Sequence, residues 1–475
     1  MNTINKKGKG IFGSLKGFSQ AFWVANSVEL FERMAYYAFF ISLTLYLSNV
    51  WGFGDFQAGI IAGTFSALLY LLPMFSGALA DKIGFRISII FAFSLLTVGY
   101  IGLALLPTFL ESSGLVTYGF GDNTRTIFSG LENSVARWSF IPALLSIVLG
   151  GSFIKSVISG TVAKETSSEN RAKGFSIFYM MVNIGAFTGK TVVDPLRKSL
   201  GDSGLIYVQY FSGIVCLIAL ITVFFLYKTN KEQGKGKSFG EIWNGLVKVV
   251  TNGRLLVLIL IVTGFWIVQQ QLYASMPKYV IRMVGEDASP GWYANVNPLI
   301  VVFCVNFVTS LMKKRRAITS MTIGMFIIPF SALIMAGGNL IGNDYILGLH
   351  PVAFMMILGI IFQALAECFI SPRYFEYFSL QSPKGEEGLY LGFSQLHSFF
   401  SSIFGFILGG ALLEKFCPDP NSVRFMGDTS SSEYIAATAN AHYLWYFFVG
   451  IGLVSACALF TYDRITKRKD KQKLV

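Results

Sequence analysis

Long apolar runs are the feature that most limits what this chain can fold into. Residues 60–77 and 203–226 form two such runs, each close to the ~20 residues that an α-helix needs to cross a bilayer. Only 13% of the 475 residues are charged and 53% are hydrophobic, whereas roughly a quarter of a soluble chain is charged. The sequence therefore predicts an all-α integral membrane protein.

The ends of the chain and its composition exclude several classes of protein. Residues 1–16 are basic and lead into a long apolar span without a small-residue cleavage site, so we expect no cleaved signal peptide. Four of the five cysteines lie within apolar spans and predict no disulfide framework. The net charge of +12 is explained by basic cytoplasmic loops, so no nucleic-acid partner is expected.

The apolar runs predict twelve spans, and the basic residues between them predict the orientation. With both termini on the cytoplasmic side, 26 Lys and Arg residues fall on inner segments and 8 on outer loops, among them Lys278 and Arg282. This excess predicts a multi-pass protein of the plasma (inner) membrane with cytoplasmic N- and C-termini. The predicted spans are 21–48, 56–80, 86–108, 138–163, 173–196, 204–227, 254–284, 291–312, 318–341, 346–380, 388–413 and 441–463.

The longest inner connection predicts two halves of six spans each. Residues 229–253 separate an N-terminal bundle, 1–228, from a C-terminal bundle, 254–475. The connection is amphipathic from Phe239 to Val250, which predicts a short helix on the membrane surface. This arrangement is typical of the major facilitator fold, whose substrate site lies at the membrane midplane between the halves.

A loop between spans two and three supports this fold. Gly77, Asp81, Gly84 and Arg86 match the G-x-x-x-D-x-x-G-x-R pattern of such transporters. Gly77 would let helices approach closely, Gly84 would allow a tight turn, and Asp81 would hold a basic partner at the inner gate. A generic basic turn is the alternative interpretation.

A stripe of ionisable side chains runs along span one. Glu29, Glu32, Arg33, Tyr36 and Tyr37 share one helical face. Ionisable groups at the bilayer centre are costly unless they are paired or face water, so we interpret the stripe as functional. The alternative is a structural ion pair of Arg33 with one Glu. Because one Arg cannot neutralise two carboxylates, a second cation or a proton is required.

Charges in other spans extend the predicted site. Lys155 in span four supplies the second cation, and Glu367 in span ten is the deepest carboxylate of the second half. A solute with a carboxylate at one end and an ammonium at the other fits this polarity. Span seven adds a face that suits hydrogen bonding to peptide groups or ordinary helix contacts, formed by Trp266, Gln269, Gln270 and Tyr273.

These residues resemble the proton-coupled oligopeptide transporter family, the peptide branch of the major facilitator superfamily. Span one carries its E-x-x-E-R-F-x-Y-Y signature from Glu29 to Tyr37, with Met34 in place of Phe. The resemblance covers all twelve spans. Its further matches are Tyr70 and Pro73, Lys155, the segment from Gly174 to Gly185 with Tyr179 and Asn183, Asn297-Pro298, and Glu367 with Ser371-Pro372.

The resemblance implies a role for each matched residue. Glu29, Glu32 and Arg33 would form the proton-coupling cluster, with Lys155 as its partner. Arg33 and Lys155 would meet the substrate carboxylate, Asn183 the substrate backbone, and Glu367 the substrate amino terminus. The expected substrate site comprises Arg33, Tyr36, Tyr37, Tyr70, Lys155, Asn183, Trp266, Gln269, Gln270, Asn297, Glu367 and His397.

The sequence also departs from the family pattern. Phe40 stands where the family has an Arg, and Gln270 stands where it has a Glu, so both partners of its outer-gate ion pair are absent. The span-eleven Trp of the family pocket is missing, with His397 and Ser398 nearby. Residues 229–253 are too few for the two extra helices that bacterial members often insert.

The resemblance implies a proton-coupled symporter that imports small zwitterionic solutes such as di- and tripeptides. We expect a functional monomer in the lipid bilayer, with a proton gradient in place of a cofactor, no catalytic residues and no metal. Proton-driven efflux and facilitated diffusion or exchange of another small organic solute remain alternatives, as does a channel or receptor. An enzyme is disfavoured because the three histidines make no metal spacing.

One segment of span five is similar to a phosphate-binding loop. Gly185 to Thr191 has three residues between its glycines rather than four, and no strand precedes it. We therefore interpret Gly185 and Gly189 as small residues that let two membrane helices pack closely.

Overall fold

The computed structural model describes residues 18–118, 131, 134–166, 170–228, 238–342, 344–382, 387–422 and 424–472. The basic segment 1–16 and linker residues 229–237 lie outside these ranges. Within them the chain is α-helical, and its only β-type pairing is an isolated bridge between Ile346 and Leu349.

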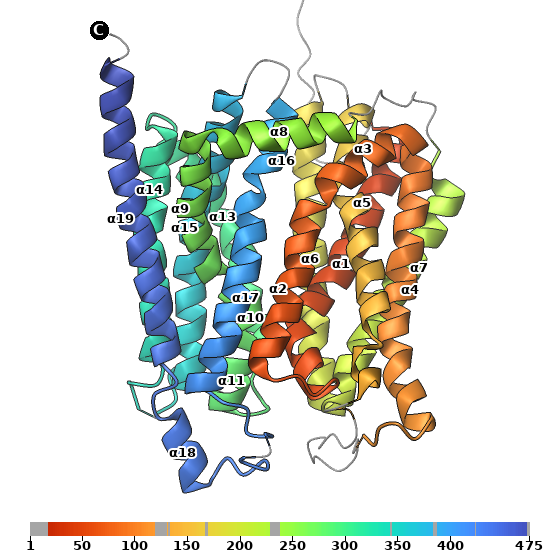
Figure 1. Cartoon of the computed structure of the whole chain (residues 1–475), viewed down its shortest axis with the longest axis vertical. Coiled ribbons are helices and arrows are strands. Elements are labelled where there is room, and N and C mark those ends of the chain that lie inside the picture. Colours follow the sequence, from red (N-terminus) through yellow and green to blue (C-terminus); the bar gives the residue numbers. More distant parts are fainter. Residues whose placement is uncertain are drawn as a thin grey trace, which may run out of the picture.

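The helices gather into two groups that stand side by side (Figure 1). The first contains α1 (Gln20–Asn49), α2 (Asp55–Leu71), α3 (Pro73–Ile83), α4 (Phe85–Ser112), η2 (Val135–Trp138), α5 (Ile141–Glu165), α6 (Arg171–Leu200) and α7 (Ser203–Leu226). The second contains α9 (Gly253–Gln269), α10 (Gln271–Ala274), α11 (Met276–Val284), α12 (Pro290–Ala294), α13 (Val296–Met312), α14 (Ala317–Gly337), α15 (Pro351–Gln381), α16 (Glu387–Ser394), α17 (Leu396–Phe416), α18 (Ser432–Thr438) and α19 (Tyr443–Gln472). Helix α8 (Phe239–Thr251) runs across one end of both groups.

The helix lengths agree with the predicted spans. In the described ranges nine helical stretches are long and apolar enough to cross a membrane, and the bent pair α2–α3 makes a tenth. Helices α1 and α6, of 30 residues each, occupy the two remaining predicted spans. Both carry charged side chains in their middle, such as Arg33 on α1 and Lys190 on α6, which lowers their apolar character.

Several spans that we expected to be continuous are broken. Span two bends by 46° between α2 and α3, where Pro73 opens the second helix because proline cannot donate to the preceding turn. Span seven divides into α9, α10 and α11, span eight into α12 and α13, and span eleven into α16 and α17. Span ten begins at Pro351 rather than at residue 346, because Leu347 and Gly348 turn with positive φ.

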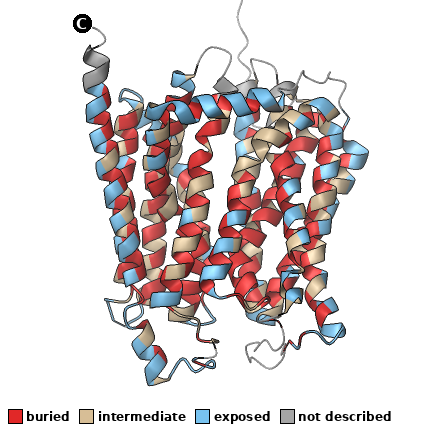
Figure 2. Cartoon of the chain, viewed as in Figure 1, coloured by how far each residue is buried: buried red, intermediate tan, exposed pale blue. Residues whose placement is uncertain are grey.

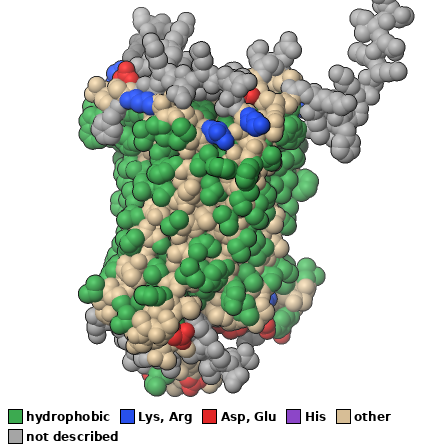
Figure 3. Space-filling view, turned by 90° about the vertical axis from the view of Figure 1, so that its right-hand side faces the viewer, with side chains coloured by type: hydrophobic (Ala, Val, Ile, Leu, Met, Phe, Trp, Pro, Cys, Tyr) green, Lys and Arg blue, Asp and Glu red, His purple; other side chains and the backbone are tan. Residues whose placement is uncertain are grey.

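The distribution of side chains is that of a protein in lipid. Buried residues face the interior of the two groups, and exposed residues face outwards (Figure 2). One side of the molecule carries a broad apolar band, with most of its visible Lys and Arg at one end and most of its visible Asp and Glu at the other (Figure 3). Phe109 on α4 and Phe225 on α7 are 63% and 66% exposed. Large aromatic side chains at that exposure are expected to contact lipid.

Close helix packing depends on glycine. A Cβ at Gly185 would lie 2.5 Å from Leu30 O, and one at Gly189 would collide with Met34 O. These two glycines therefore bring α6 against α1, which confirms the interpretation as small-residue packing. Gly59 and Gly63 bring α2 against α17 in the same way.

Helix α8 confirms the amphipathic helix predicted in the linker. Its N-terminus is fixed by a capping box, in which Ser238 Oγ accepts from Glu241 N at 3.2 Å and Glu241 Oε2 accepts from Ser238 N at 2.7 Å. These bonds satisfy backbone and side-chain groups at the first turn, where an α-helix lacks internal partners.

Candidate functional site

Two carboxylates of α1 lie within ion-pair distance of one guanidinium. Arg33 Nε lies 3.1 Å from Glu29 Oε1 and 2.5 Å from Glu32 Oε2, and none of the three residues is more than 7% exposed. Glu29 Oε2 is buried with no hydrogen-bond partner in the described part of the chain. The helical spacing thus brings the three together as expected, with one positive charge for two carboxylates.

Lys155 of α5 lies beside this cluster. Its Nζ donates a hydrogen bond to Leu69 O at 3.2 Å and stands 4.0 Å from the centre of the Tyr70 ring. Its charge interacts with those of Glu29 and Glu32. Helices α2 and α5 therefore place the second cation next to the α1 carboxylates.

Glu367 of α15 is held by two amides of the second group. Its Oε2 accepts from Gln269 Nε2 at 2.8 Å and from Asn297 Nδ2 at 3.3 Å. No hydrogen bond to its Oε1 is made within the described ranges. The carboxylate is therefore oriented by α9 and α13 while one oxygen remains able to accept a bond from a ligand.

Tyrosines adjoin the α1 cluster: the Tyr36 ring lies 5.5 Å from the Arg33 guanidinium and 5.1 Å from the Tyr37 ring. Tyr37 and Tyr70 are within electrostatic reach of both Arg33 and Glu367, and Tyr179 is within reach of Tyr37 and Glu367. The α1 cluster and Glu367 thus belong to one polar region that joins the two groups of helices.

A cavity of about 660 Å³ adjoins this region between α6 and α13. Tyr179 and Asn183 contribute polar groups to a wall that is otherwise mainly apolar. Asn183 Nδ2 donates to Tyr179 O at 2.7 Å, so its side-chain oxygen is left for another partner. The volume is within the range of small-molecule sites, roughly 300–1,000 Å³.

An aromatic contact occupies the place of the ion pair that the sequence lacks. The Phe40 ring lies 4.8 Å from that of Tyr273 and 5.6 Å from that of Phe406, so it joins α1 to α10 and α17. Gln270 Nε2 donates to Ser402 Oγ at 3.3 Å, and Ser402 Oγ is 2.9 Å from Ser66 Oγ. Neutral contacts therefore connect the two groups at this level.

Trp266 and His397 lie together on the second group. Their rings are 5.2 Å apart. His397 is 1% exposed, with Nδ1 2.6 Å from Ser394 O and Nε2 3.0 Å from Ser398 Oγ. Both ring nitrogens thus have partners on neighbouring residues, and the imidazole ring packs against the Trp266 ring.

The loop motif adopts the expected local geometry at two of its positions. Gly84 has φ +94°, a conformation that favours glycine. A Cβ on Gly77 would lie 3.0 Å from Ser156 Cβ, which brings α3 close to α5. Arg86 Nη2 donates to Phe224 O at 2.9 Å, and Asp81 stands near the end of α3.

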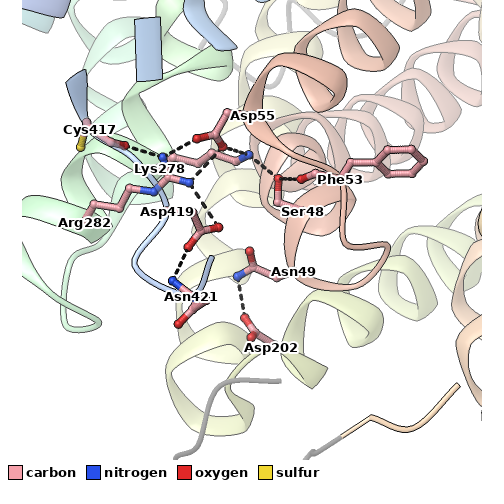
Figure 4. Close-up of polar contacts among 10 residues, drawn as sticks. All are labelled: Ser48, Asn49, Phe53, Asp55, Asp202, Lys278, Arg282, Cys417, Asp419 and Asn421. Carbon is pink, nitrogen blue, oxygen red and sulfur yellow. Dashed lines mark hydrogen bonds and ion pairs between the residues drawn. The ribbon is translucent and has the colours of Figure 1, made fainter. Parts of the chain in front are cut away.

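A buried charge network that the sequence did not predict joins the groups at the end opposite α8 (Figure 4). Asp55 of α2 accepts from Lys278 Nζ at 2.7 Å and from Arg282 Nη1 and Nη2 at 2.7 and 2.9 Å. Lys278 also donates to Ser48 Oγ at 2.5 Å, and Arg282 Nη2 lies 3.4 Å from Asp419 Oδ2. The prediction that Lys278 and Arg282 lie in outer loops is wrong, because both lie in α11 and their side chains are 2% and 5% exposed.

Helices α6 and α12 make a second connection that the sequence did not predict. Lys190 Nζ donates to Ala294 O at 3.2 Å, and Asp194 Oδ2 accepts from Trp292 N at 2.9 Å. Gly291 is required here because a Cβ would lie 2.5 Å from Lys190 O. The only sequence signal was that Lys190 is a cation within an apolar span.

Comparison with known proteins agrees with this arrangement. Residues 28–346 match the model of the Major Facilitator Superfamily. The chain is 26% identical over 315 residues to dipeptide and tripeptide permease A of Citrobacter koseri, covering 64% of this chain and 56% of that protein. It is 29% identical over 237 residues to peptide transporter family 1 of Caenorhabditis elegans, covering 48% and 26%. The chain thus spans about half the length, or less, of these curated relatives.

Solved structures share the fold over nearly the whole chain. A crystal structure of a peptide transporter POT in complex with sulfate has a TM-score of 0.69 and 17% identity, with 96% of both chains covered. A structure described as giving insights into substrate recognition in proton dependent oligopeptide transporters has a TM-score of 0.67 and 17% identity, covering 94% of this chain and 99% of that one. These structures confirm the fold, and the curated relatives named as peptide transporters agree with the resemblance to the peptide branch. The chain is a multi-pass integral membrane protein that belongs to the Major Facilitator Superfamily, a family of transporters and not of enzymes.

Proposed function

We propose that the protein is a proton-coupled symporter that imports small zwitterionic solutes, with di- and tripeptides as the best-matched class. The observation that carries this proposal is the pairing of Arg33 and its two carboxylates on α1 with Glu367 on α15, linked by Tyr37 and Tyr70. The names of the curated relatives, dipeptide and tripeptide permease and peptide transporter, support the same class.

The charges suggest how a solute binds and how a proton follows it. A solute carboxylate would bind Arg33 and Lys155, and a solute ammonium would donate to the unpartnered oxygen of Glu367. When the carboxylate draws Arg33 and Lys155 away, Glu29 and Glu32 lose their counter-charges. A buried carboxylate without a counter-charge is costly, so one of them takes up a proton.

Alternating access would move two halves about this site. We propose residues 1–228 and 254–475 as the moving bundles, with 229–253 as their cytoplasmic linker. The α8 end would face the cytoplasm, as the Lys and Arg there support (Figure 3). The Asp55 network and the α6–α12 contacts would then close the outer end. We further propose that the protein works as a monomer in the plasma (inner) membrane.

Transport in proteoliposomes tests the function. With an inward proton gradient we expect uphill uptake from a panel of di- and tripeptides, and a protonophore should abolish the uphill component. Counterflow into preloaded vesicles would rank the peptides of the panel without a proton gradient. Uptake that depends on neither pH nor the protonophore would contradict proton coupling. If no peptide of the panel is transported, peptides are not the substrate class.

Cysteine labelling tests the orientation. Single cysteines at residue 235, which lies outside the described ranges, and at the C-terminus should react with a membrane-impermeant reagent only after cells are permeabilised. Labelling of either site in intact cells would contradict cytoplasmic termini.

One observation favours a second candidate. The aromatic contact of Phe40 with Tyr273 and Phe406 stands where the family has an ion pair. Such a gate carries no titratable charge at that level, as suits a facilitator or exchanger. The protonophore measurement distinguishes the two candidates.

A further inference from the structure

A cavity of about 390 Å³ lies between α3, α5 and α8, where the linker helix α8 meets the first group (Figure 1). Its lining residues come from these three helices and from Leu72 at the break before α3, and none of them lines the cavity between α6 and α13. The volume is within the range of small-molecule sites, roughly 300–1,000 Å³. The proposed transport cycle does not use this cavity.

The α3 wall is an apolar stripe that ends in a cation. Leu72, Phe75, Leu79 and Lys82 are three or four residues apart, so they follow one face of the helix. Lys82 lies in the last turn of α3 and is exposed. Within the described ranges no carboxylate pairs with it. The stripe therefore leads from apolar side chains to an ammonium that has no ion-pair partner in this part of the chain.

The hydroxyl groups of the cavity wall are occupied within the protein. Ser76 Oγ donates to Ser152 O at 2.8 Å, and Ser152 Oγ donates to Leu149 O at 2.7 Å. Because each hydroxyl has one proton, neither serine can donate to a ligand while these bonds are made. The α5 wall otherwise consists of the apolar side chains of Leu149 and Phe153. Among the lining residues that the structure describes, Lys82 alone is charged.

The cavity borders on surface that faces lipid. Leu79 is 48% exposed, and the Phe153 ring lies 5.5 Å from that of Phe91 on α4, which is 47% exposed. Exposed apolar surface of this kind marks contact with the membrane. Ile242 lines the cavity from α8, an amphipathic helix of the type that lies at the level of the lipid headgroups. The apolar stripe is therefore at the depth of the acyl chains, with Lys82 near the headgroups, where lysine side chains place their ammonium.

We propose that this cavity is a lipid-binding site: it holds one acyl chain of an anionic phospholipid, and the headgroup phosphate accepts a charge-assisted hydrogen bond from Lys82. The apolar walls fit the chain but do not distinguish headgroups, so the choice of lipid depends on Lys82. An anionic headgroup neutralises the ammonium, whereas a choline headgroup brings a cation of its own to the same place. The inference goes beyond the proposed function and does not depend on what the protein transports.

Competition between two lipids tests the headgroup contact. Full-length protein in detergent is equilibrated with equimolar phosphatidylglycerol and phosphatidylcholine of identical acyl chains, and native mass spectrometry counts the lipids that stay bound. Wild type and K82R should retain phosphatidylglycerol in preference. K82Q should reduce this preference about five-fold, the effect of one lysine beside a membrane phosphate. K314Q, which removes an exposed lysine of the α13–α14 loop outside the cavity, should match wild type.

Two outcomes of this competition would refute the headgroup contact. One is a wild-type preference for phosphatidylglycerol that survives in K82Q. The other is an equal loss of preference in K82Q and K314Q, since the basic surface as a whole would then attract the lipid.

A cavity-filling variant tests the acyl-chain contact. A78W places an indole in the cavity, because Ala78 lines it, and should lower the retention of both lipids while Lys82 remains. V98W, at a 64% exposed position on α4 outside the cavity, should retain both lipids as wild type does. Phosphatidylglycerol should also raise the melting temperature of wild type more than that of A78W, because a ligand of the folded state stabilises it. Unchanged retention in A78W would overturn the proposal, and if A78W does not fold, the K82Q and K82R comparison decides.

Discussion

Neutralising Asp55 should open the end of the molecule opposite α8. Asp55 of the first group accepts hydrogen bonds from both Lys278 and Arg282 of the second group (Figure 4). The side chains of these three residues are no more than 5% exposed. The change D55N keeps the size of the side chain and removes the charge that holds the two cations.

The expected magnitude follows from the contacts. Asp55 accepts three charge-assisted hydrogen bonds, each worth about 1.5–3 kcal/mol, but they share partners and do not add. Removing one partner of a buried ion network costs about 3–5 kcal/mol. When the halves separate here, the cations become hydrated, so the cost falls mainly on the closed state. At about 1.4 kcal/mol per factor of ten, the closed-to-open ratio should fall by roughly a hundred-fold or more.

Distance measurements between spin labels provide the assay. In a cysteine-free background, labels at Ser112 and Leu340 report on the ends of α4 and α14, because both positions are exposed on opposite groups. D55N should lengthen the distance distribution in reconstituted protein without solute.

A carboxylate near the same end supplies the control. Glu433 pairs with Arg424 at 2.8 Å, but these side chains are 57% and 63% exposed, and surface pairs of this kind contribute about 0–1 kcal/mol. E433Q should leave the distances as in wild type. If D55N and E433Q give the same distribution as wild type, the Asp55 network does not hold this end closed.

Three further predictions concern coupling, binding and packing. Glu29→Gln or Glu32→Gln should abolish uphill proton-driven uptake in proteoliposomes, because a glutamine side chain cannot bind the transported proton. Counterflow, which needs no proton gradient, should persist in part. Glu367→Gln should weaken amine-bearing ligands by about 1.5–3 kcal/mol relative to their N-acetylated analogues, as measured by competition binding. Gly59→Val should lower the free energy of unfolding by about 1–3 kcal/mol, because its first carbon would collide with a backbone carbonyl of α17. Gly450→Ala, which meets nothing within 4 Å, should not change the melting temperature.

Each of these has an outcome that contradicts it. Uphill uptake that survives in both single glutamine variants and in their double variant would remove the α1 cluster from coupling. Equal weakening of free and acetylated ligands would make Glu367 a structural residue. Equal melting temperatures for the two glycine variants would mean that the close contact between α2 and α17 at Gly59 does not contribute to stability.

Features that depend on local periodicity could be predicted from the sequence. An apolar run of the right length specifies a membrane helix wherever it later packs, so the count of spans agreed with the helices. Glu29, Glu32 and Arg33 are three and four residues apart, and the helical repeat alone brings their side chains together. Gly84 and the amphipathic α8 are local in the same sense, since a turn and a helix face are properties of neighbouring residues.

The contacts between the two groups of helices were decided by the tertiary structure. Asp55 and Lys278 are 223 positions apart, and Lys190 and Ala294 are 104 apart. Hydrophobic periodicity predicts which face of a helix is buried, but it does not predict which distant helix will pack against that face. The breaks at α10, α11 and α12 also turn Lys278, Arg282 and Gly291 toward the first group, where a continuous helix would have presented other faces. The sequence therefore determined the charges of the α1 cluster, whereas packing decided that Asp55, Lys278 and Arg282 are buried together and balance one another.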